Sequence, residues 1–206
     1  MLKLILILGL SYLLGSIPFG YLLVRIFRGE DVRRSGSGNI GATNVSRKSP
    51  ALGAMTLLLD AAKGFVAVQL AGALSGVPAG NVHLQRAMAA ASLFAIIGHM
   101  FPLWLGFHGG KGVATALGAF LRFAPQAVLI AVIIFLVVTL VSRRISLGSI
   151  VTAMLFPSIV WMLKLTKDPG VLGLIGAAAL LIVGRHHENV RRLLSGEEPR
   201  FSLGRK

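Results

Sequence analysis

Residues 124–142 read APQAVLIAVIIFLVVTLVS, nineteen positions without one charged side chain. A helix needs about 20 mostly apolar residues to cross the hydrocarbon core of a lipid bilayer. This stretch therefore predicts a transmembrane helix, and it sets the class of protein in which the rest of the chain is interpreted.

Similar stretches recur along the 206-residue chain, in which 55% of the side chains are hydrophobic and only 14% are charged. This composition lies outside the range of soluble proteins. Further spans are expected at 2–24, 51–74, 87–105, 145–163 and 170–184. A shorter apolar segment, Val113–Phe123, either crosses or re-enters the membrane packed inside protein. We predict an all-α polytopic membrane protein with about seven transmembrane helices, one of them short.

The basic residues predict the orientation. With seven spans and the N-terminus outside, the cytoplasmic segments are 25–50, 106–112, 143–144 and 185–206. These segments hold 15 Lys and Arg residues, against 5 on the opposite side, as the positive-inside rule requires. Topology then accounts for the net charge of +14 without a nucleic-acid partner, and the C-terminus lies in the cytoplasm.

Because no internal repeat is evident, residues 1–206 are expected to form a single membrane domain. Residues 188–206 are expected to form a basic cytoplasmic tail at the membrane surface, since Val190, Leu193 and Leu194 share one side of a short basic helix.

A polar loop, SGSGNIGATNVSRK at residues 35–48, follows the first span. Glycines let backbone N–H groups turn toward an anion, while hydroxyl, amide and guanidinium groups add donors. The candidate donors for a phosphate are Ser35, Ser37, Asn39, Thr43, Asn44 and Arg47. The loop also contains G-x-G-x-x-G, but a membrane span precedes it where a dinucleotide site needs a strand. A solvated turn that caps the second span remains the alternative for this loop taken alone.

A second glycine loop, Gly109-Gly110-Lys111-Gly112, lies on the same predicted face of the membrane. It lacks the Ser or Thr that a nucleotide phosphate loop carries after the lysine. Two such loops on one face favour a site for two phosphorylated ligands. His186 and Asn189, spaced i, i+3, share a helix face toward that site.

Other chemistries are disfavoured by residue type and spacing. The chain has no cysteine, which excludes disulfides and an acyl-cysteine intermediate. The histidines form no i, i+4 pair and no acidic cluster accompanies them, so a metal site is not expected. Asp60 and Lys63 lie inside the second span, where mutual pairing is the default interpretation and a role in ion passage the alternative.

Three motifs in order resemble those of the bacterial acyl-phosphate:glycerol-3-phosphate acyltransferases, the PlsY family. They are GSGNIGATN at 36–44 with Arg47 shortly after, GHMFPLWLGFHGGKGVAT at 98–115, and GRHHENVRRLLSGEE at 184–198. LLLDAAKG at 57–64 also resembles the family's second span. The chain departs from the family pattern at His108, where another basic residue is common.

This resemblance implies a bacterial inner-membrane enzyme with its site facing the cytoplasm. It would transfer a fatty acyl group from acyl phosphate to the 1-position hydroxyl of glycerol 3-phosphate. The products, lysophosphatidic acid and phosphate, complete the first acylation of bacterial phospholipid synthesis. The donor is already activated, so no cofactor and no metal is needed.

The resemblance also assigns residues. Catalytic roles fall to Ser37, Lys111, His186 and Asn189, and phosphate or substrate binding to Gly38, Asn39, Gly41, Thr43, Arg47, Gly109, Gly110, Ser142 and Arg143, the last two being a weaker match. Either His186 or a substrate phosphate would accept the hydroxyl proton.

The implied partners are the two substrates and membrane lipid. The enzyme that produces the acyl phosphate is an open candidate, and neither the oligomeric state nor the acyl-chain preference follows from the sequence. The rival function is an organic-anion or phosphate-ester transporter. Such a protein would carry broken helices near mid-membrane, related by an internal repeat.

Overall fold

The computed structural model describes residues 2–201, and all regular secondary structure within that range is helical. In chain order the elements are α1 (Leu2–Gly15), α2 (Phe19–Arg28), η1 (Val32–Arg34), α3 (Ala42–Ser46), α4 (Pro50–Ser75), α5 (Val82–Met100), η2 (Leu103–Leu105), α6 (Val113–Phe123), α7 (Pro125–Ser142), α8 (Ile145–Met162), α9 (Pro169–Gly184) and α10 (His187–Leu194). The 3₁₀ turn η1 lies in the connection predicted after the first span, whereas η2 lies inside the predicted span 87–105, because α5 ends at Met100, shortly before Pro102.

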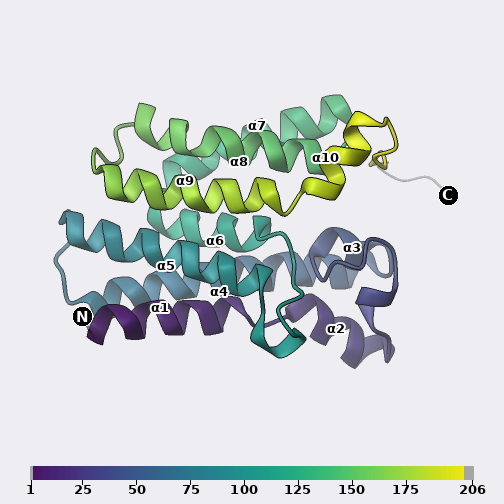
Figure 1. Cartoon of the computed structure of the whole chain (residues 1–206), viewed down its shortest axis with the longest axis horizontal. Helices are drawn as coiled ribbons and strands as arrows, with labels where there is room; N and C mark the ends of the chain where they lie inside the picture. Colours follow the sequence, from purple (N-terminus) through teal and green to yellow (C-terminus); the bar gives the residue numbers. More distant parts are fainter. Residues whose placement is uncertain (1, 202–206) are drawn as a thin grey trace. The chain divides into compact units, whose positions relative to one another are not determined.

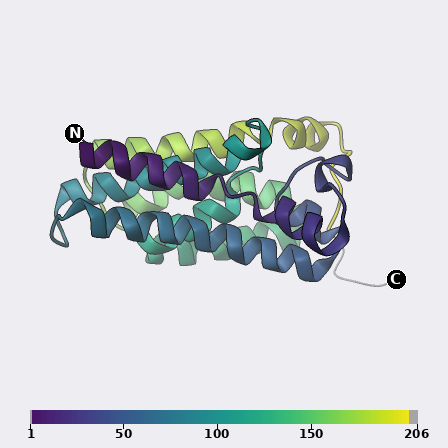
Figure 2. The same cartoon turned by 90° about the horizontal axis from the view of Figure 1, so that it is seen from below.

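The chain divides into two compact units, residues 1–123 and 124–206. In the first unit α4 packs against α1, α5 and α6, and α1 also packs against α5 (Figure 1). The same four helices run alongside one another when the molecule is turned by 90° (Figure 2). In the second unit α8 packs against both α7 and α9. The single domain expected over residues 1–206 stays a prediction.

The first predicted span, 2–24, is broken in the structure into α1 and α2. Pro18 has no N–H to donate and disfavours helical backbone in the residue before it. The helix therefore stops at Gly15, and Leu22 donates to the Pro18 carbonyl at 3.0 Å where α2 begins. The two pieces together remain long and apolar enough, at 27 residues, to cross a membrane.

The second predicted span, 51–74, matches α4, which has sequence-encoded ends. The Ser49 side chain accepts a hydrogen bond from the Leu52 N–H, Pro50 occupies the first turn, and Gly76 ends the helix with φ of 66°. These are the residue types that start and stop helices, since proline tolerates the first turn and glycine the left-handed conformation.

Two helix crossings in the first unit depend on glycines. A Cβ placed on Gly118 of α6 would collide with the Ala61 carbonyl of α4, and one on Gly64 of α4 would collide with the Thr115 carbonyl of α6. Small residues let membrane helices approach closely where no hydrophobic effect drives them together. The α4–α6 crossing therefore has its spacing set by backbone contact.

The short helix α6 has the bounds expected from the sequence, but its 11 residues span only about 16 Å. The hydrocarbon core is about 30 Å thick. The loop before α6 must therefore reach into membrane depth for this segment to cross.

In the second unit, α7 ends where Arg143 takes a left-handed conformation with φ of 56°. The Asp168 side chain caps α9 by accepting from the Val171 N–H at 2.9 Å. A bend of 55° separates α9 from α10. The short helix expected after Glu188 is present as α10, and its place at the membrane surface stays a prediction. Residues 202–206 of the predicted basic tail lie outside the described residues.

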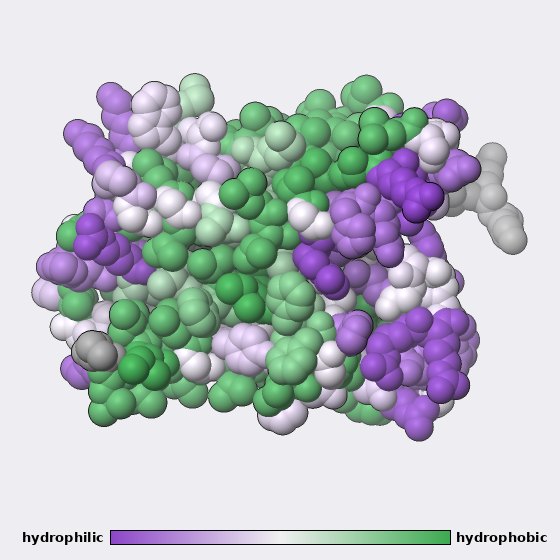
Figure 3. Space-filling model, viewed as in Figure 1, coloured by the Kyte–Doolittle hydropathy of each residue, from purple (hydrophilic) through white to green (hydrophobic). Residues whose placement is uncertain are grey.

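Apolar side chains cover the helices, and hydrophilic ones gather in the first unit near α2 and α3 (Figure 3). On α7, Leu129, Ile133 and Val141 are 64%, 60% and 83% exposed, as suits a helix that faces lipid. Among residues 2–201 five helical segments are long and apolar enough to span a membrane, or six if α9 and α10 form one span. The all-helical membrane class is confirmed, while the count of seven remains a prediction.

Candidate active site

The first glycine loop is a preformed turn that leads into α3. Gly36 and Gly38 have φ of 58° and 69°, a conformation that costs glycine little and other residues more. The Gly38 N–H donates to the Ser35 carbonyl at 3.0 Å, and the Asn39 side chain accepts from the Gly41 N–H at 2.8 Å. Local hydrogen bonds of this kind give the loop its shape without a ligand.

Asn44 holds this loop together from within. Its side chain is 3% exposed, and its amide nitrogen donates to the carbonyls of Val32, Ser35 and Asn39 at 3.2, 3.0 and 2.9 Å. Its amide oxygen accepts from the Ser37 N–H at 3.0 Å. These bonds use both amide hydrogens, so the contacts of Asn44 point to a role in shaping the loop.

The remaining predicted donors differ in exposure. Ser37, Thr43 and Arg47 are exposed, whereas Ser35 is half-buried and its hydroxyl donates to the Val32 carbonyl at 3.1 Å. Arg47 lies close to the loop, because a Cβ on Gly36 would stand 3.2 Å from its Nη1. The hydroxyls of Ser37 and Thr43 and the Arg47 guanidinium are therefore the exposed donors of this loop.

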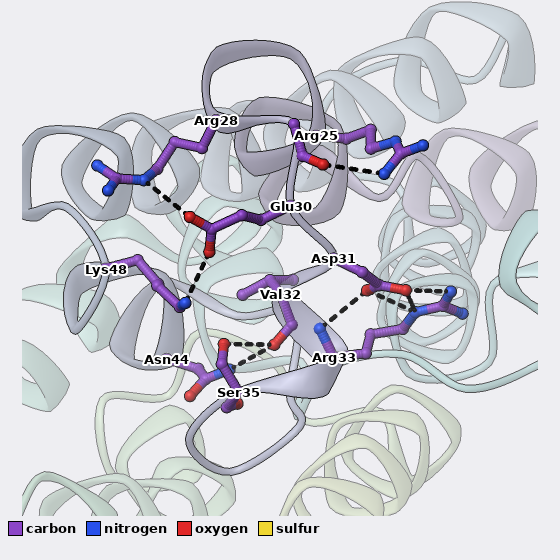
Figure 4. Close-up of polar contacts among 10 residues, drawn as sticks. Arg25, Arg28, Glu30, Asp31, Val32, Arg33, Ser35, Asn44 and Lys48 are labelled. Carbon is purple, nitrogen blue, oxygen red and sulfur yellow. Dashed lines mark hydrogen bonds and ion pairs between the residues drawn. The ribbon is translucent and has the colours of Figure 1, made fainter.

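A cleft of about 610 Å³ lies beside the loop, lined by Tyr21, Arg25, Gly29, Glu30, Asp31, Arg34, Ser35 and Lys48. Its two carboxylates are already paired (Figure 4). Lys48 Nζ lies 2.6 Å from Glu30 Oε2, and Arg33 Nη2 lies 2.8 Å from Asp31 Oδ2. The hydrogen bond from Lys48 lowers the pKa of Glu30, and that from the Arg33 side chain lowers the pKa of Asp31 to about 2.

These pairs fix both carboxylates in the ionised state at neutral pH, so the acidic residues of the cleft accept no proton in a reaction there. The cations of the cleft, in contrast, give its rim a surplus of positive charge. That surplus favours the approach of anionic substrates to the neighbouring loop.

The second glycine loop is pinned to the end of α5. Gly109 N–H donates to the Met100 carbonyl at 3.1 Å, and Gly110 N–H donates to the His99 carbonyl at 3.0 Å. Both glycines are buried, and a Cβ on either would collide with His99 or its carbonyl. Lys111 is half-buried and stands two residues before the start of α6.

One apolar cluster joins the first loop to η2, the turn that precedes the second loop. Its buried members are Leu23, Val24, Val32, Ile40, Val45 and Leu52, and Leu105 of η2 packs against them. Residues from α2, the first loop and α4 thus share a core with η2, which precedes the second glycine loop. The prediction that the two loops belong together is consistent with this packing.

Asp60 and Lys63 form the ion pair that the sequence predicted, with Nζ and Oδ1 2.7 Å apart. The sequence did not predict that His99 joins them, with its Nδ1 3.0 Å from Lys63 Nζ. His99 is 36 residues from Lys63 along the chain, so no spacing rule could have linked the two.

The second unit gathers the third motif. His186 is 2% exposed at the bend between α9 and α10, and its Nδ1 lies 2.7 Å from the Ile182 carbonyl oxygen. A carbonyl only accepts, so Nδ1 carries a proton, and Nε2 of the neutral ring is an acceptor. Asn189, which is 6% exposed, lies on α10, three residues after His186.

Glu198 is a residue that sequence reasoning missed, although it lies in the quoted third motif. Its carboxylate accepts from Ser146 Oγ at 2.5 Å, from Asn189 Nδ2 at 2.6 Å and from Arg192 Nε at 2.7 Å. Burial opposes its ionisation, but these three hydrogen bonds prevail and hold the pKa of Glu198 below its ordinary value. The carboxylate thereby orients the Asn189 amide.

The weaker matches, Ser142 and Arg143, lie at the turn between α7 and α8. Ser142 Oγ donates to the Val138 carbonyl at 2.6 Å and accepts from the Arg144 N–H at 3.1 Å. The Arg143 carbonyl accepts from the Phe201 N–H at 2.6 Å, and its side chain is exposed. Through Phe201 and Glu198 this turn is connected to α10 and the third motif.

Within residues 2–201 no three His, Asp or Glu side chains come together in a group that would hold a metal ion.

Known proteins resemble this chain along nearly its whole length. Residues 5–196 match the family model described as glycerol-3-phosphate acyltransferase. The glycerol-3-phosphate acyltransferase of Agrobacterium fabrum is 44% identical over 193 residues, 93% of this chain and 89% of the relative. The enzyme of that name from Geobacter sulfurreducens is 42% identical over 202 residues, 98% and 99% of the two chains.

Solved structures of an acyltransferase of the same name are also similar to this chain. A crystal structure of PlsY, an integral membrane glycerol 3-phosphate acyltransferase, in its glycerol 3-phosphate form has a TM-score of 0.87 at 35% identity, covering 97% of this chain and 96% of that one. The lysophosphatidic acid form of PlsY has a TM-score of 0.84 at 34% identity, covering 97% and 95%. The resemblance indicated by the three motifs is confirmed, and the chain belongs to the glycerol-3-phosphate acyltransferase family.

Proposed function

We propose that this protein transfers a fatty acyl group from acyl phosphate to the 1-position hydroxyl of glycerol 3-phosphate. The observation that carries the proposal is the likeness of 97% of the chain to an acyltransferase structure in its glycerol 3-phosphate form. The chain supplies donors of the type that phosphate needs on two glycine loops of one unit. The absence of cysteine from the sequence agrees with a donor that needs no acyl-cysteine intermediate.

The first loop and Lys111 hold the phosphates in this proposal. Ser37 and Thr43 donate hydroxyl hydrogens, and Arg47 offers two parallel N–H groups. Lys111 adds a point charge beside the N-terminus of α6, where backbone N–H groups also favour anions. Asn44 keeps the first loop in shape, so that the donors are set before a ligand arrives.

The transfer is a single displacement at the acyl carbon. The hydroxyl oxygen of glycerol 3-phosphate attacks the carbonyl carbon and forms an ester bond, and the bond from that carbon to the phosphate oxygen breaks. The departing phosphate takes the hydroxyl proton. Arg47 and Lys111 offset the negative charge that develops during the transfer.

His186 and Asn189 orient the acceptor. The hydrogen bond from His186 Nδ1 to the Ile182 carbonyl fixes the orientation of the ring, and the amide of Asn189 is oriented by Glu198. Alignment of two bound reactants removes much of the entropic barrier of a bimolecular step. The histidine thus acts through position, and the substrate phosphate as the base.

The site faces the cytoplasm in the proposed topology, with the N-terminus outside and seven crossings of the bacterial inner membrane. The count of 15 against 5 basic residues supports this orientation, and α6 with its preceding loop supplies the short crossing. The transporter alternative has less support, because Asp60 and Lys63 neutralise each other inside the first unit.

The decisive assay uses the purified protein in lipid nanodiscs with acyl phosphate and radiolabelled glycerol 3-phosphate. Lysophosphatidic acid and inorganic phosphate are expected in equal amounts, and none with acyl-coenzyme A as the donor. If intact acyl phosphate gives no lysophosphatidic acid, the proposal is wrong. Uptake of glycerol 3-phosphate into sealed vesicles without acylation would favour the transporter.

A further inference from the structure

A buried charged cluster lies among α4, α5 and the break between α1 and α2. Asp60, Lys63 and His99 are 1%, 4% and 3% exposed. Lys63 Nζ donates to the Ile17 carbonyl at 2.7 Å, forms an ion pair with Asp60 Oδ1 at 2.7 Å and lies 3.0 Å from His99 Nδ1. A carbonyl oxygen, a carboxylate and an imidazole nitrogen thus lie within 3.0 Å of the buried ammonium.

Each of these three groups belongs to a different segment. Ile17 lies in the break of the first span, where Pro18 leaves carbonyls without helical partners. Asp60 is on α4, one turn before the lysine, and His99 is near the end of α5. Lys63 therefore links its own helix, α4, to α5 and to the break between α1 and α2.

The contact with Lys63 also orients the His99 ring. Its Nδ1 lies 3.0 Å from Lys63 Nζ and 3.5 Å from Asp60 Oδ1, so both charged groups of the cluster hold the ring on the same side. Nε2 lies against Gly110, where any Cβ would overlap it. The backbone of His99 reaches the same residue, since its carbonyl accepts from the Gly110 N–H at 3.0 Å.

The glycine loop is irregular backbone that precedes a helix only about 16 Å long. Irregular backbone at membrane depth is tolerated only where it is buried in protein and its polar groups are paired. The end of α5 supplies that pairing through the carbonyls of His99 and Met100. Lys111 is the next residue after the pinned glycines.

A gain in the stability of the fold does not by itself explain why such a cluster is present. A buried ion pair pays a desolvation cost that often equals or exceeds its attraction, and apolar replacements are frequently neutral. What an ion pair adds is a defined geometry. Here the defined geometry extends through His99 to Gly110, the residue before Lys111.

We propose that Asp60, Lys63 and His99 are positioning residues, which hold the Gly109–Gly110 turn against α5 and so set the place of the Lys111 ammonium. This inference deepens the proposed function and rests on it for the role of Lys111. The three residues touch no substrate in this account. They act through the backbone of the loop.

A double-mutant cycle tests this in the full-length protein in nanodiscs. His99→Gln removes the ring, and the pair Asp60→Asn with Lys63→Met removes both charges without leaving one unpaired. Each is expected to raise, by about tenfold, the KM for the same substrate whose KM rises in Lys111→Ala. In the Lys111→Ala background the further change is expected to be less than twofold, because coupled residues are not additive. Independent, multiplicative effects would refute the inference.

Thr56→Val is the matched control. Thr56 is buried on the same helix, but its hydroxyl donates to the Leu52 carbonyl of its own helix at 2.7 Å. A lower thermal midpoint with unchanged KM is expected for this variant. If Thr56→Val raises the same KM as His99→Gln, general damage to α4 explains the effect and the inference is wrong.

Amide hydrogen exchange supplies a readout that needs no activity. The peptide covering residues 106–112 is expected to lose protection in His99→Gln and in the double variant, and to keep it in Thr56→Val. Unchanged protection in both cluster variants would overturn the inference whatever the enzyme catalyses. Loss of protection in a protein that makes no lysophosphatidic acid would instead support the positioning role of the cluster and contradict the proposed function.

Discussion

Ser37 and Arg47 are exposed on a loop whose shape other residues hold. Removing either one therefore costs a ligand contact without unfolding the loop. We expect Ser37→Ala and Arg47→Ala to raise the KM for a phosphate substrate, Arg47→Ala by about 10- to 100-fold, as for a charge-assisted hydrogen bond. Steady-state kinetics with each substrate varied in turn measure this. Arg28→Gln removes an equal charge outside the loop and should keep wild-type KM; if it does not, net charge explains the result.

Asn44 should behave in the opposite way, because its amide bonds to the loop rather than to a ligand. Replacement by Ala leaves up to three carbonyls and one N–H without their partner, each at a cost of about 1–3 kcal/mol. A clear fall in thermal midpoint together with lost activity is expected for Asn44→Ala. Wild-type stability with altered KM alone would mean that Asn44 binds substrate directly.

Glu198 offers a prediction on acid stability. Its pKa lies below the ordinary 4.5 in the folded protein, so its ionised form stabilises the fold above that pH. The contribution is lost as the pH falls through the lowered folded value. Glu198→Gln should lower the thermal midpoint at pH 7 and flatten the decline on acidification below about pH 4.5. A variant with an unchanged midpoint and an equally steep acid decline would contradict the assigned hydrogen bonds.

At the scale of the helices, the α4–α6 crossing depends on backbone contact at Gly64 and Gly118. Gly118→Ala should push the helices apart and destabilise the first unit by about 1–3 kcal/mol, as overpacking does. Thermal unfolding in detergent measures the effect. Gly9→Ala on α1 is the control, because a Cβ there meets nothing within 4 Å. Equal thermal midpoints for the two variants would contradict the close backbone contact at this crossing.

For the whole molecule, the proposed orientation can be tested because the chain contains no cysteine of its own. Single cysteines at the exposed positions Ala79, Gln126 and Ser195 report on three connections. A membrane-impermeant maleimide should label Ala79→Cys and Gln126→Cys in intact spheroplasts, and Ser195→Cys only after permeabilisation. If Gln126→Cys needs permeabilisation while Ala79→Cys does not, α6 does not cross and the seven-span topology is wrong.

The helices themselves were largely predictable from the sequence. Apolar length predicted each long helix, and residues such as Ser49, Pro50 and Gly76 mark ends that local chemistry alone decides. The break at Pro18 was not expected, although proline is the residue that makes it. Mean hydropathy stays high enough across the break for residues 2–28 to pass as one span, so hydropathy did not reveal it.

Family membership and the motif residues Ser37, Lys111, His186 and Asn189 were also available from the sequence, because each motif is contiguous. The partners of these residues were not. Asp60 and Lys63 are one helical turn apart and could be paired by spacing, but His99 and Glu198 meet their partners through folding alone. By itself the sequence determined the membrane class, the apolar segments and the family, since these depend on composition and on neighbours along the chain. Only the tertiary structure decided what holds the glycine loops, since those contacts join residues that are distant in sequence and lie together only when the helices pack.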